Sequence, residues 1–430
     1  MRVARIALAA GAVLSLVLAK RAHAQQNQPD STLVNALSAG EADAEPKTRK
    51  LVKWNEFDGK YLTFRFGGGF LVDYATYSQD SASKEQVTLE PAAKIRDVRI
   101  LVSGRLKTKR RITYQAGFMY DAYNEDWFIR QSGVMIGIPE WWGNLFIGRS
   151  KEGASLNKMM TGYDGWTAER FTFSDAIPLL ADGIKWLGYI PSRHLIWNVG
   201  VFTDWLSEKE TWSYFDQQVV GRVAYVPFVS DSSGTLLHLG FAVETGKPDN
   251  GQRQLRSKPE VSHAPYIIDT GKIPSDRSTL FGPEIYFRRG PVLVGSEYYW
   301  EKIHSPETGN PTFQGGDVSV VWNATGETRR YNTVGGYFKA VSPTQTVFEG
   351  GPGTLEMVLR LSYSDLDGGT VNGGKFWRIT PMVNWYLNTQ ARLEFSYGLG
   401  GLDRFGGHSR TEFFQARLQL QFTKLSVATD

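Results

Sequence analysis

The sequence predicts an all-β protein, a transmembrane antiparallel β-barrel of about 16 strands. Three observations support this fold class. The chain begins with an export signal, short segments alternate between apolar and polar residues along most of its length, and aromatic residues gather at the ends of these segments. Convincing helical periodicity is rare from Lys60 onwards.

Residues 1–24 are expected to be a signal peptide. Arg2 and Arg5 precede the apolar stretch Ile6–Ala19, and Ala22-His23-Ala24 fits a small-x-small cleavage pattern. The apolar stretch has about 14 residues, fewer than the roughly 20 that span a bilayer as a helix. We expect the polar residues 25–58 to be a linker, residues 59–422 to form the barrel, and residues 423–430 to be a C-terminal tail.

The composition argues against several other classes of protein. The chain has no cysteine, which excludes disulfides and thiolate metal sites, and its six histidines are scattered. Cleavage of the signal peptide lowers the 48 basic residues to 44, which equals the 44 acidic residues. We therefore expect no metal, no cofactor and no nucleic-acid partner. Ser155–Lys158 matches a Ser-x-x-Lys motif, but its companion motifs are absent, so we expect no enzyme.

The clearest strand pattern covers Phe413–Phe422. One face is wholly apolar, and the residues between its members are polar apart from Phe413; the apolar face consists of Phe414, Ala416, Leu418, Leu420 and Phe422. In a membrane barrel the apolar face meets lipid and the polar face lines the lumen. A soluble sandwich shows the same alternation. A secreted, carbohydrate-binding β protein therefore remains an alternative.

Two features favour the barrel. Aromatic residues lie at strand ends, as at Trp127-Phe128, Trp141-Trp142 and Tyr298-Tyr299-Trp300. Tight turns such as residues 387–390 alternate with long polar stretches such as residues 249–278, as expected for short periplasmic turns and long outer loops. Candidate strands occur about once per 23 residues between residues 60 and 422, which gives roughly 16 strands. A barrel of that size encloses a water-filled lumen.

Several segments resemble the phosphate-selective porin family of Gram-negative outer membranes. The most specific is Phe313–Trp322 leading into Thr325-Gly-Glu-Thr-Arg-Arg-Tyr331, which is similar to the family's Thr-Gly-Glu-x-Arg-x-Tyr turn. Arg256–Glu260 and Val383–Asn388 resemble its central region and last hairpins. The family's Gly-x-x-Lys-Glu-Pro-Phe element is present only as Gly148–Gly153, without the Pro-Phe.

The resemblance implies a homotrimeric channel in the bacterial outer membrane, in contact with its lipid, that passes small anionic solutes such as phosphate. It also implies that one long loop folds into the pore. An outer-membrane barrel without phosphate selectivity, with a general porin, adhesion or structural role, remains an alternative.

Candidate pore residues follow from strand parity and from this loop. Arg99, Arg105 and Lys107 share one parity of a strand whose other parity is apolar, so we expect them to face the lumen. Lys158 and Arg170 lie in the stretch 151–182, where the family folds its loop into the pore. The alternative for the three strand residues is that they are ordinary lumenal charges paired with acids such as Asp97. The alternative for Lys158 and Arg170 is that they cap an outer loop and have no role in conduction.

Overall fold

The structure, a computed structural model, describes residues 55–121, 125–205, 214–230 and 233–422. The predicted signal peptide, most of the predicted linker and the predicted C-terminal tail lie outside these ranges. None of the helices in the described ranges is long and apolar enough to span a bilayer.

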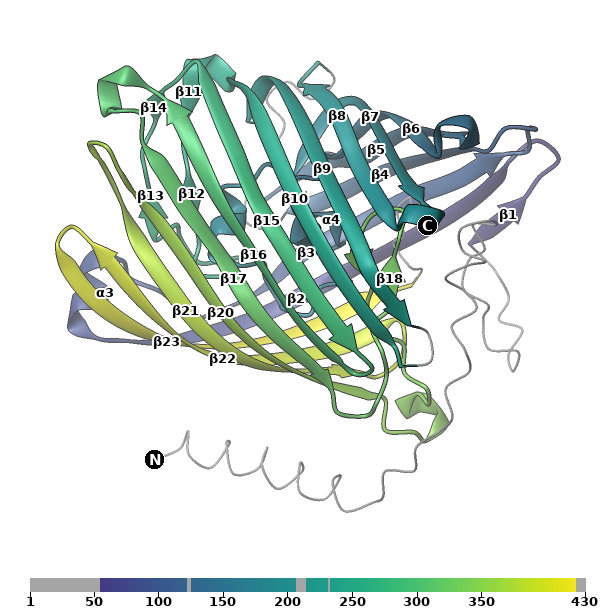
Figure 1. Ribbon diagram of the computed structural model, residues 1–430. Coiled ribbons are helices and arrows are strands. Elements are labelled where there is room, and N and C mark those ends of the chain that lie inside the picture. Colours follow the sequence, from purple (N-terminus) through teal and green to yellow (C-terminus); the bar gives the residue numbers. More distant parts are fainter. Residues whose placement is uncertain (1–54, 122–124, 206–213, 231–232, 423–430) are drawn as a thin grey trace.

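A sheet of 17 strands dominates the fold (Figure 1). The short β1 (Glu56–Asp58) pairs with β2, and the other 16 strands form the barrel. Their bounds are β2 Thr63–Gln79, β3 Ala92–Leu106, β4 Ile112–Asp121, β5 Asp126–Ile138, β6 Gly143–Lys151, β7 Leu180–Ile190, β8 Leu195–Thr203, β9 Phe215–Ser230, β10 Thr235–Pro248, β15 Arg277–Arg289, β16 Val292–His304, β17 Thr312–Asn323, β20 Thr354–Gly368, β21 Val371–Tyr386, β22 Ala391–Arg404 and β23 Gly407–Gln421.

Shorter elements lie in the connections. The helices are α3 (Ser81–Gln86) and α4 (Leu156–Met159). The 3-10 turns are η1 Pro139–Trp141, η2 Thr172–Asp175, η3 Pro191–Arg193, η4 Asp249–Gly251, η5 Pro306–Thr308 and η6 Val347–Glu349. Three two-stranded ribbons are formed by β11 (Gln252–Arg253) with β14 (Ile273–Pro274), β12 (Arg256–Ser257) with β13 (Ile268–Asp269), and β18 (Tyr331–Asn332) with β19 (Tyr337–Phe338).

The barrel closes because β23 pairs antiparallel with β2, for example at Leu418 and Val72. Each of the other barrel strands pairs antiparallel with its neighbours in chain order. We call the end at which β2 begins and β23 ends the inner end, and the opposite end the outer end. The predicted fold class and strand number are thus confirmed.

Strand alternation sorts side chains between two environments. On β20, Leu359 and Leu361 are 52% and 48% exposed on the outside of the barrel, whereas Arg360 is 2% exposed inside it. On β23, Gln415, Arg417 and Gln419 are likewise buried inside. The apolar outer surface is what a strand needs in order to face lipid, where charged groups are costly.

Three long connections fill much of the lumen. Residues 152–179 and 249–276 enter from the outer end, and residues 324–353 enter from the inner end. Their apolar side chains pack on the barrel wall in two clusters, one containing Phe171, Phe173 and Ile268, the other containing Trp166 and Phe338. The loop that we expected to enter the pore is thus observed as residues 152–179.

The connection 324–353 departs from the expected pattern of short turns at the inner end. This connection folds back into the barrel, where it buries Tyr331, Tyr337 and Phe338. Burial of these aromatic side chains favours the inserted position, since exposing them to water would cost free energy. The Thr-Gly-Glu segment seen in the sequence begins this connection and leads the chain back into the lumen.

Candidate functional site

The loop of residues 152–179, which we call the inward loop, is fixed to the barrel wall by two glutamates. These glutamates face each other on the neighbouring strands β15 and β16. Glu284 and Glu297 are register partners. The Leu156 amide donates to Glu284 Oε2 at 3.0 Å and the Asn157 amide donates to Glu297 Oε1 at 2.7 Å. Ser155, which caps α4, also donates its hydroxyl to Glu297 Oε2 at 2.5 Å. Carboxylates suit this position because the amides at the start of a helix lack partners within the helix.

Arginines of β20, β22 and β23, together with Arg329 of the connection 324–353, hold the next part of the loop by its backbone. Their guanidinium groups donate to successive loop carbonyls, and we call these four residues the arginine clamp: Arg329 to Asp164 at 2.9 Å, Arg392 to Gly165 at 2.6 Å, Arg417 to Ala168, and Arg360 to Glu169 at 2.8 Å. Asn384 donates to the carbonyl of Trp166 at 2.8 Å in the same row. Residues 164–169 are therefore held mainly through their main chain.

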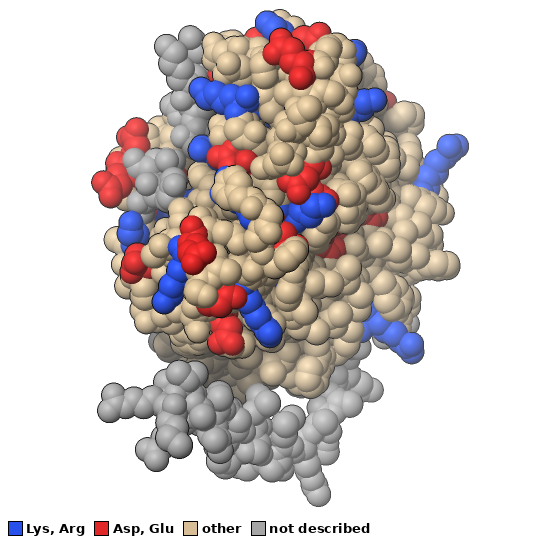
Figure 2. Space-filling model, turned by 90° about the vertical axis from the view of Figure 1, so that its left-hand side faces the viewer, with Lys and Arg blue, Asp and Glu red and all other residues tan. Residues whose placement is uncertain are grey.

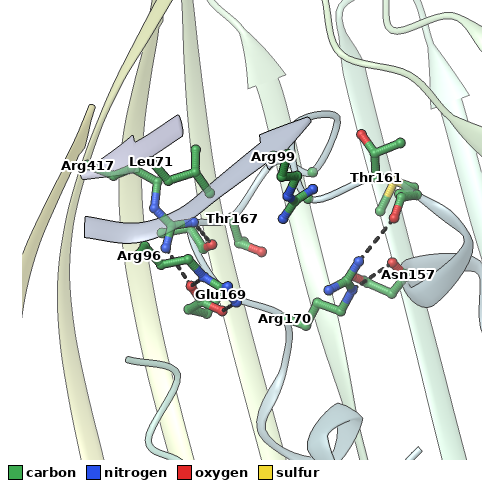
Figure 3. A pocket seen from close by; sticks show the side chains of 13 residues that line it. Leu71, Arg96, Arg99, Asn157, Thr161, Thr167, Glu169, Arg170 and Arg417 are labelled. Carbon is green, nitrogen blue, oxygen red and sulfur yellow. Dashed lines mark hydrogen bonds and ion pairs between the residues drawn. The ribbon is translucent and has the colours of Figure 1, made fainter. Parts of the chain in front are cut away.

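Between this loop and the wall formed by β2 and β3 lies a pocket rich in arginine (Figure 3). Its charged lining consists of Arg96, Arg99, Arg170, Arg417 and Glu169. Neutral loop residues such as Asn157, Thr161 and Thr167 complete it. Four guanidinium groups and one carboxylate thus line a confined space, where low-dielectric walls strengthen the field of fixed charges.

A second pocket continues this basic region along the wall. It shares Arg99 and Thr161 with the first pocket and adds Arg130 and Lys151. The Arg99 guanidinium stacks 4.7 Å from the ring centre of Tyr163, and it is paired with Asp97 at 2.7 Å. The Lys151 ammonium donates to the carbonyls of Met159 and Met160 at 3.0 and 2.5 Å.

Burial and the neighbouring charges shift the pKa values of Arg170 and Glu169, the two charged loop residues in the pocket. Burial lowers the pKa of Arg170 to about 10, with Arg99 and Arg96 adding repulsion. Burial acts to raise the pKa of Glu169, but Arg96 and Arg417 outweigh it and hold that pKa below its usual range. At neutral pH both Arg170 and Glu169 are therefore ionised.

The structure brings together two of the five predicted pore residues. Arg99 and Arg170 both line the arginine pocket. Lys158 is buried on α4 but does not line either pocket. Arg105 is exposed near the inner end of β3, and Lys107, just past that strand, pairs with Asp58 of β1 at 2.6 Å.

Strand parity did not single out Arg96 and Arg130, because both lie at irregularities of the sheet. The β2–β3 register shifts where Leu71 pairs with Asp97 and Val72 with Ile95, so Arg96 has no direct partner. The β4–β5 register shifts between Ala116 and Phe118, opposite Arg130. A β-bulge reverses the parity of the following residues and re-aims side chains. Arg417 is different, because its inward parity was visible in the sequence.

A candidate cation site is limited to one acidic group in the described residues. Asp204, Asp216 and Asp249, at the outer ends of β8–β10, have carboxylate oxygens within 4.8 Å of one another. Lys247 already pairs with Asp216 at 2.9 Å. We assign no metal to this group.

Comparison with known proteins identifies the family of the chain. The model of the family described as phosphate-selective porin O and P matches residues 64–422. The chain belongs to this family. An uncharacterized protein of Caulobacter vibrioides is 32% identical over 185 residues, and the match spans 42% of this chain but only 36% of that protein.

Several solved structures share the architecture. OmpF of Salmonella typhi, in a complex with daunomycin, has a TM-score of 0.54 at 11% identity over 85% of this chain and 100% of its own. An anion-selective porin from Comamonas acidovorans has a TM-score of 0.52 at 12% identity, over 84% of this chain and 100% of its own. The trimer form of OmpT of Vibrio cholerae has a TM-score of 0.50 at 13% identity, over the same shares.

At such identities these structures support the fold, while the family match carries the assignment. This porin is a β-barrel of the bacterial outer membrane. Its family is one of channels rather than of enzymes.

Proposed function

We propose that this porin is a passive, water-filled channel for small solutes that prefers anions, phosphate and similar oxyanions among them. The observation that carries the proposal is the arginine pocket beside the inward loop. It combines Arg96, Arg99, Arg170 and Arg417 with Glu169 as the acid of its lining. Arginine suits oxyanions because its planar fork of donors matches their geometry.

The outer end of the barrel does not carry a comparable concentration of positive charge. Figure 2 shows acidic and basic side chains interspersed over the end that carries α3, with neither sign dominant. Exposed charges are also screened within about 8 Å at physiological salt. We therefore attribute the preference for anions to charges inside the barrel, which are less well screened.

Further features of the proposal concern assembly and processing. We propose a homotrimer, as the printed description of the Vibrio cholerae OmpT structure gives for that protein. Outer-membrane lipid would cover the apolar outer surface, and residues 1–24 would be removed as a signal peptide. N-terminal sequencing of the protein from outer membranes tests the cleavage site, and cross-linking in native membranes tests the trimer.

The channel function is tested by recording the purified full-length protein in planar bilayers under a potassium chloride gradient. The reversal potential should indicate anion preference, and phosphate added to one side should block the chloride current. Arg170→Gln and Arg99→Gln should each lower the anion preference and weaken the block. Lys109→Gln, an exposed inner-end residue, is the matched control and should change neither.

Three results contradict the proposal in different ways. A cation-selective reversal potential in the wild-type protein would contradict the anion preference. Anion preference without phosphate block would indicate a general porin. A protein that forms no channel at all would indicate an adhesion or structural role.

A further inference from the structure

Glu169 occupies an unusual place in the arginine pocket. Its carboxylate makes a two-pronged ion pair with Arg96, with Oε1 3.0 Å from Nε and Oε2 3.2 Å from Nη2. Arg417 Nη2 donates to the same Oε1. A carboxylate held by two guanidinium groups in this way has the position and the donors that a bound oxyanion would take. Figure 3 shows the contact with Arg96 among the lining side chains.

Two other acids pair with arginines of the pocket but do not line it. Asp97 belongs to β3 and forms a two-pronged pair with Arg99, at 3.0 and 2.7 Å, and it also accepts from Arg96 Nη1 at 3.1 Å. Asp73 belongs to β2 and pairs with Arg417 at 2.6 Å through both oxygens. Both are fixed to the barrel. Glu169 alone among these three is carried by the inward loop.

Glu169 is not needed to hold that loop in place. The arginine clamp and Asn384 already hold the main chain of residues 164–169 through its carbonyls, including the carbonyl of Glu169 itself. Glu284 and Glu297 hold the start of α4. The Glu169 side chain can therefore leave Arg96 without releasing the loop.

Glu169 and Arg96 are also within reach of solvent. Their side chains are 16% and 18% exposed, whereas the side chain of Arg417 is 2% exposed. Both partners of this ion pair are therefore accessible to solvent and to small solutes.

We propose that the Glu169 carboxylate is a tethered counter-ion that competes with permeating oxyanions for Arg96 and Arg417. This rests on the proposed anion channel and adds a specificity-determining residue to it. An anion displaces the carboxylate on entering, and the carboxylate returns as the anion leaves. Conduction requires binding that is weak enough to release the ion, and an internal competitor weakens binding without removing the arginines.

The test compares two neutralised acids in the full-length protein, recorded in planar bilayers with inorganic phosphate as the probe. Glu169→Gln keeps the shape of the side chain and removes its charge. The half-blocking concentration of phosphate should fall about tenfold, because the arginines lose a charge-assisted partner at short range. Glu140→Gln removes the same charge from an exposed side chain that pairs with Arg110 at the inner end, and it should leave the block unchanged.

A conservative variant separates competition from loop anchoring. Glu169→Asp retains the charge and should keep the half-blocking concentration within about twofold of wild type. If Glu169 only anchors the loop, Glu169→Gln should raise the current noise and leave the half-blocking concentration unchanged or higher, and this would overturn the proposal. Phosphate that blocks neither wild type nor Glu169→Gln would overturn it as well. The wild-type reversal potential then reports separately whether the anion preference itself holds.

Discussion

The Arg329 guanidinium and the Glu356 carboxylate form a two-pronged ion pair inside the barrel, with Nε–Oε2 at 2.6 Å and Nη2–Oε1 at 2.8 Å. Arg329 belongs to the Thr-Gly-Glu segment, and Glu356 lies on β20. Arg329 also donates to the carbonyls of Lys339 and Asp164. One side chain thus connects the inner-end connection, the barrel wall and the inward loop.

We expect Arg329→Gln to destabilise the barrel and loosen both inserted segments. Removing one partner of a buried ion pair costs about 3–5 kcal/mol, because the remaining charge is left uncompensated. The midpoint of heat-induced unfolding in detergent should fall, and single-channel currents should become larger and noisier. The neighbouring exposed residue provides the control, since Arg330→Gln should preserve both properties. Wild-type behaviour of Arg329→Gln would show that the segment is held by other contacts.

A second prediction concerns the lipid-facing surface. Leu359→Arg should impair assembly, because a charge near the bilayer midplane costs about 2–4 kcal/mol on the lipid face of a barrel. The control is Phe405→Arg, which also replaces an exposed apolar side chain with arginine. Phe405 lies in the outer-end turn between β22 and β23, so this variant should assemble normally. The readout is the fraction of folded, heat-modifiable protein in outer membranes. Equal assembly of the two variants would mean that Leu359 does not face hydrocarbon.

A third prediction concerns the anchoring of the inward loop. Ser155→Ala removes the cap of α4 and the hydroxyl bond to Glu297. Loss of such a cap costs about 1 kcal/mol, enough to loosen the loop without unfolding the barrel. Open-channel noise should rise while the heat-unfolding midpoint stays within a few degrees of wild type. Ser155→Thr keeps the hydroxyl and should restore quiet currents; noise that persists in Ser155→Thr would argue against the cap.

The barrel could be predicted from the sequence because alternation along a strand reports its two environments directly. Leu359, Arg360 and Leu361 show the rule in three consecutive residues, since the two leucines are exposed on the outside of the barrel and the arginine is buried inside. The same rule predicted a lumenal position for Arg99, which lines the arginine pocket.

The residues of the arginine pocket and of the arginine clamp were harder to predict from the sequence, for two physical reasons. Bulges shift the register beside Arg96 and Arg130, and alternation within one strand cannot reveal an extra residue relative to its partner. The clamp residues Arg360, Arg392 and Arg417 bind loop carbonyls that are distant in sequence, so no local pattern distinguishes an arginine that holds a loop from one that meets a solute. Lys158 lies in the expected loop but lines neither pocket, because position in a loop does not determine where a side chain points.

The last prediction concerns pH and follows from Lys158. Burial lowers the pKa of Lys158 to about 7, with repulsion from Arg170 adding to the effect and Asp175, Glu152 and Glu244 opposing it. A base with this pKa is charged below pH 7 and neutral above it. Between pH 6 and pH 8 the loop therefore loses positive charge as pH rises. The anion preference measured by reversal potential should decline over the same interval.

Two substitutions separate Lys158 from other groups that titrate in this range. Burial also raises the pKa of Glu152 to about 7, so that residue gains negative charge over the same interval and acts in the same direction. Lys158→Gln should reduce the pH dependence and leave the part that Glu152 contributes. Lys158→Arg keeps its charge throughout and should shift the reversal potential towards stronger anion preference at pH 8. A pH profile that is identical in wild type and Lys158→Gln would show that the charge of Lys158 does not reach the conduction path.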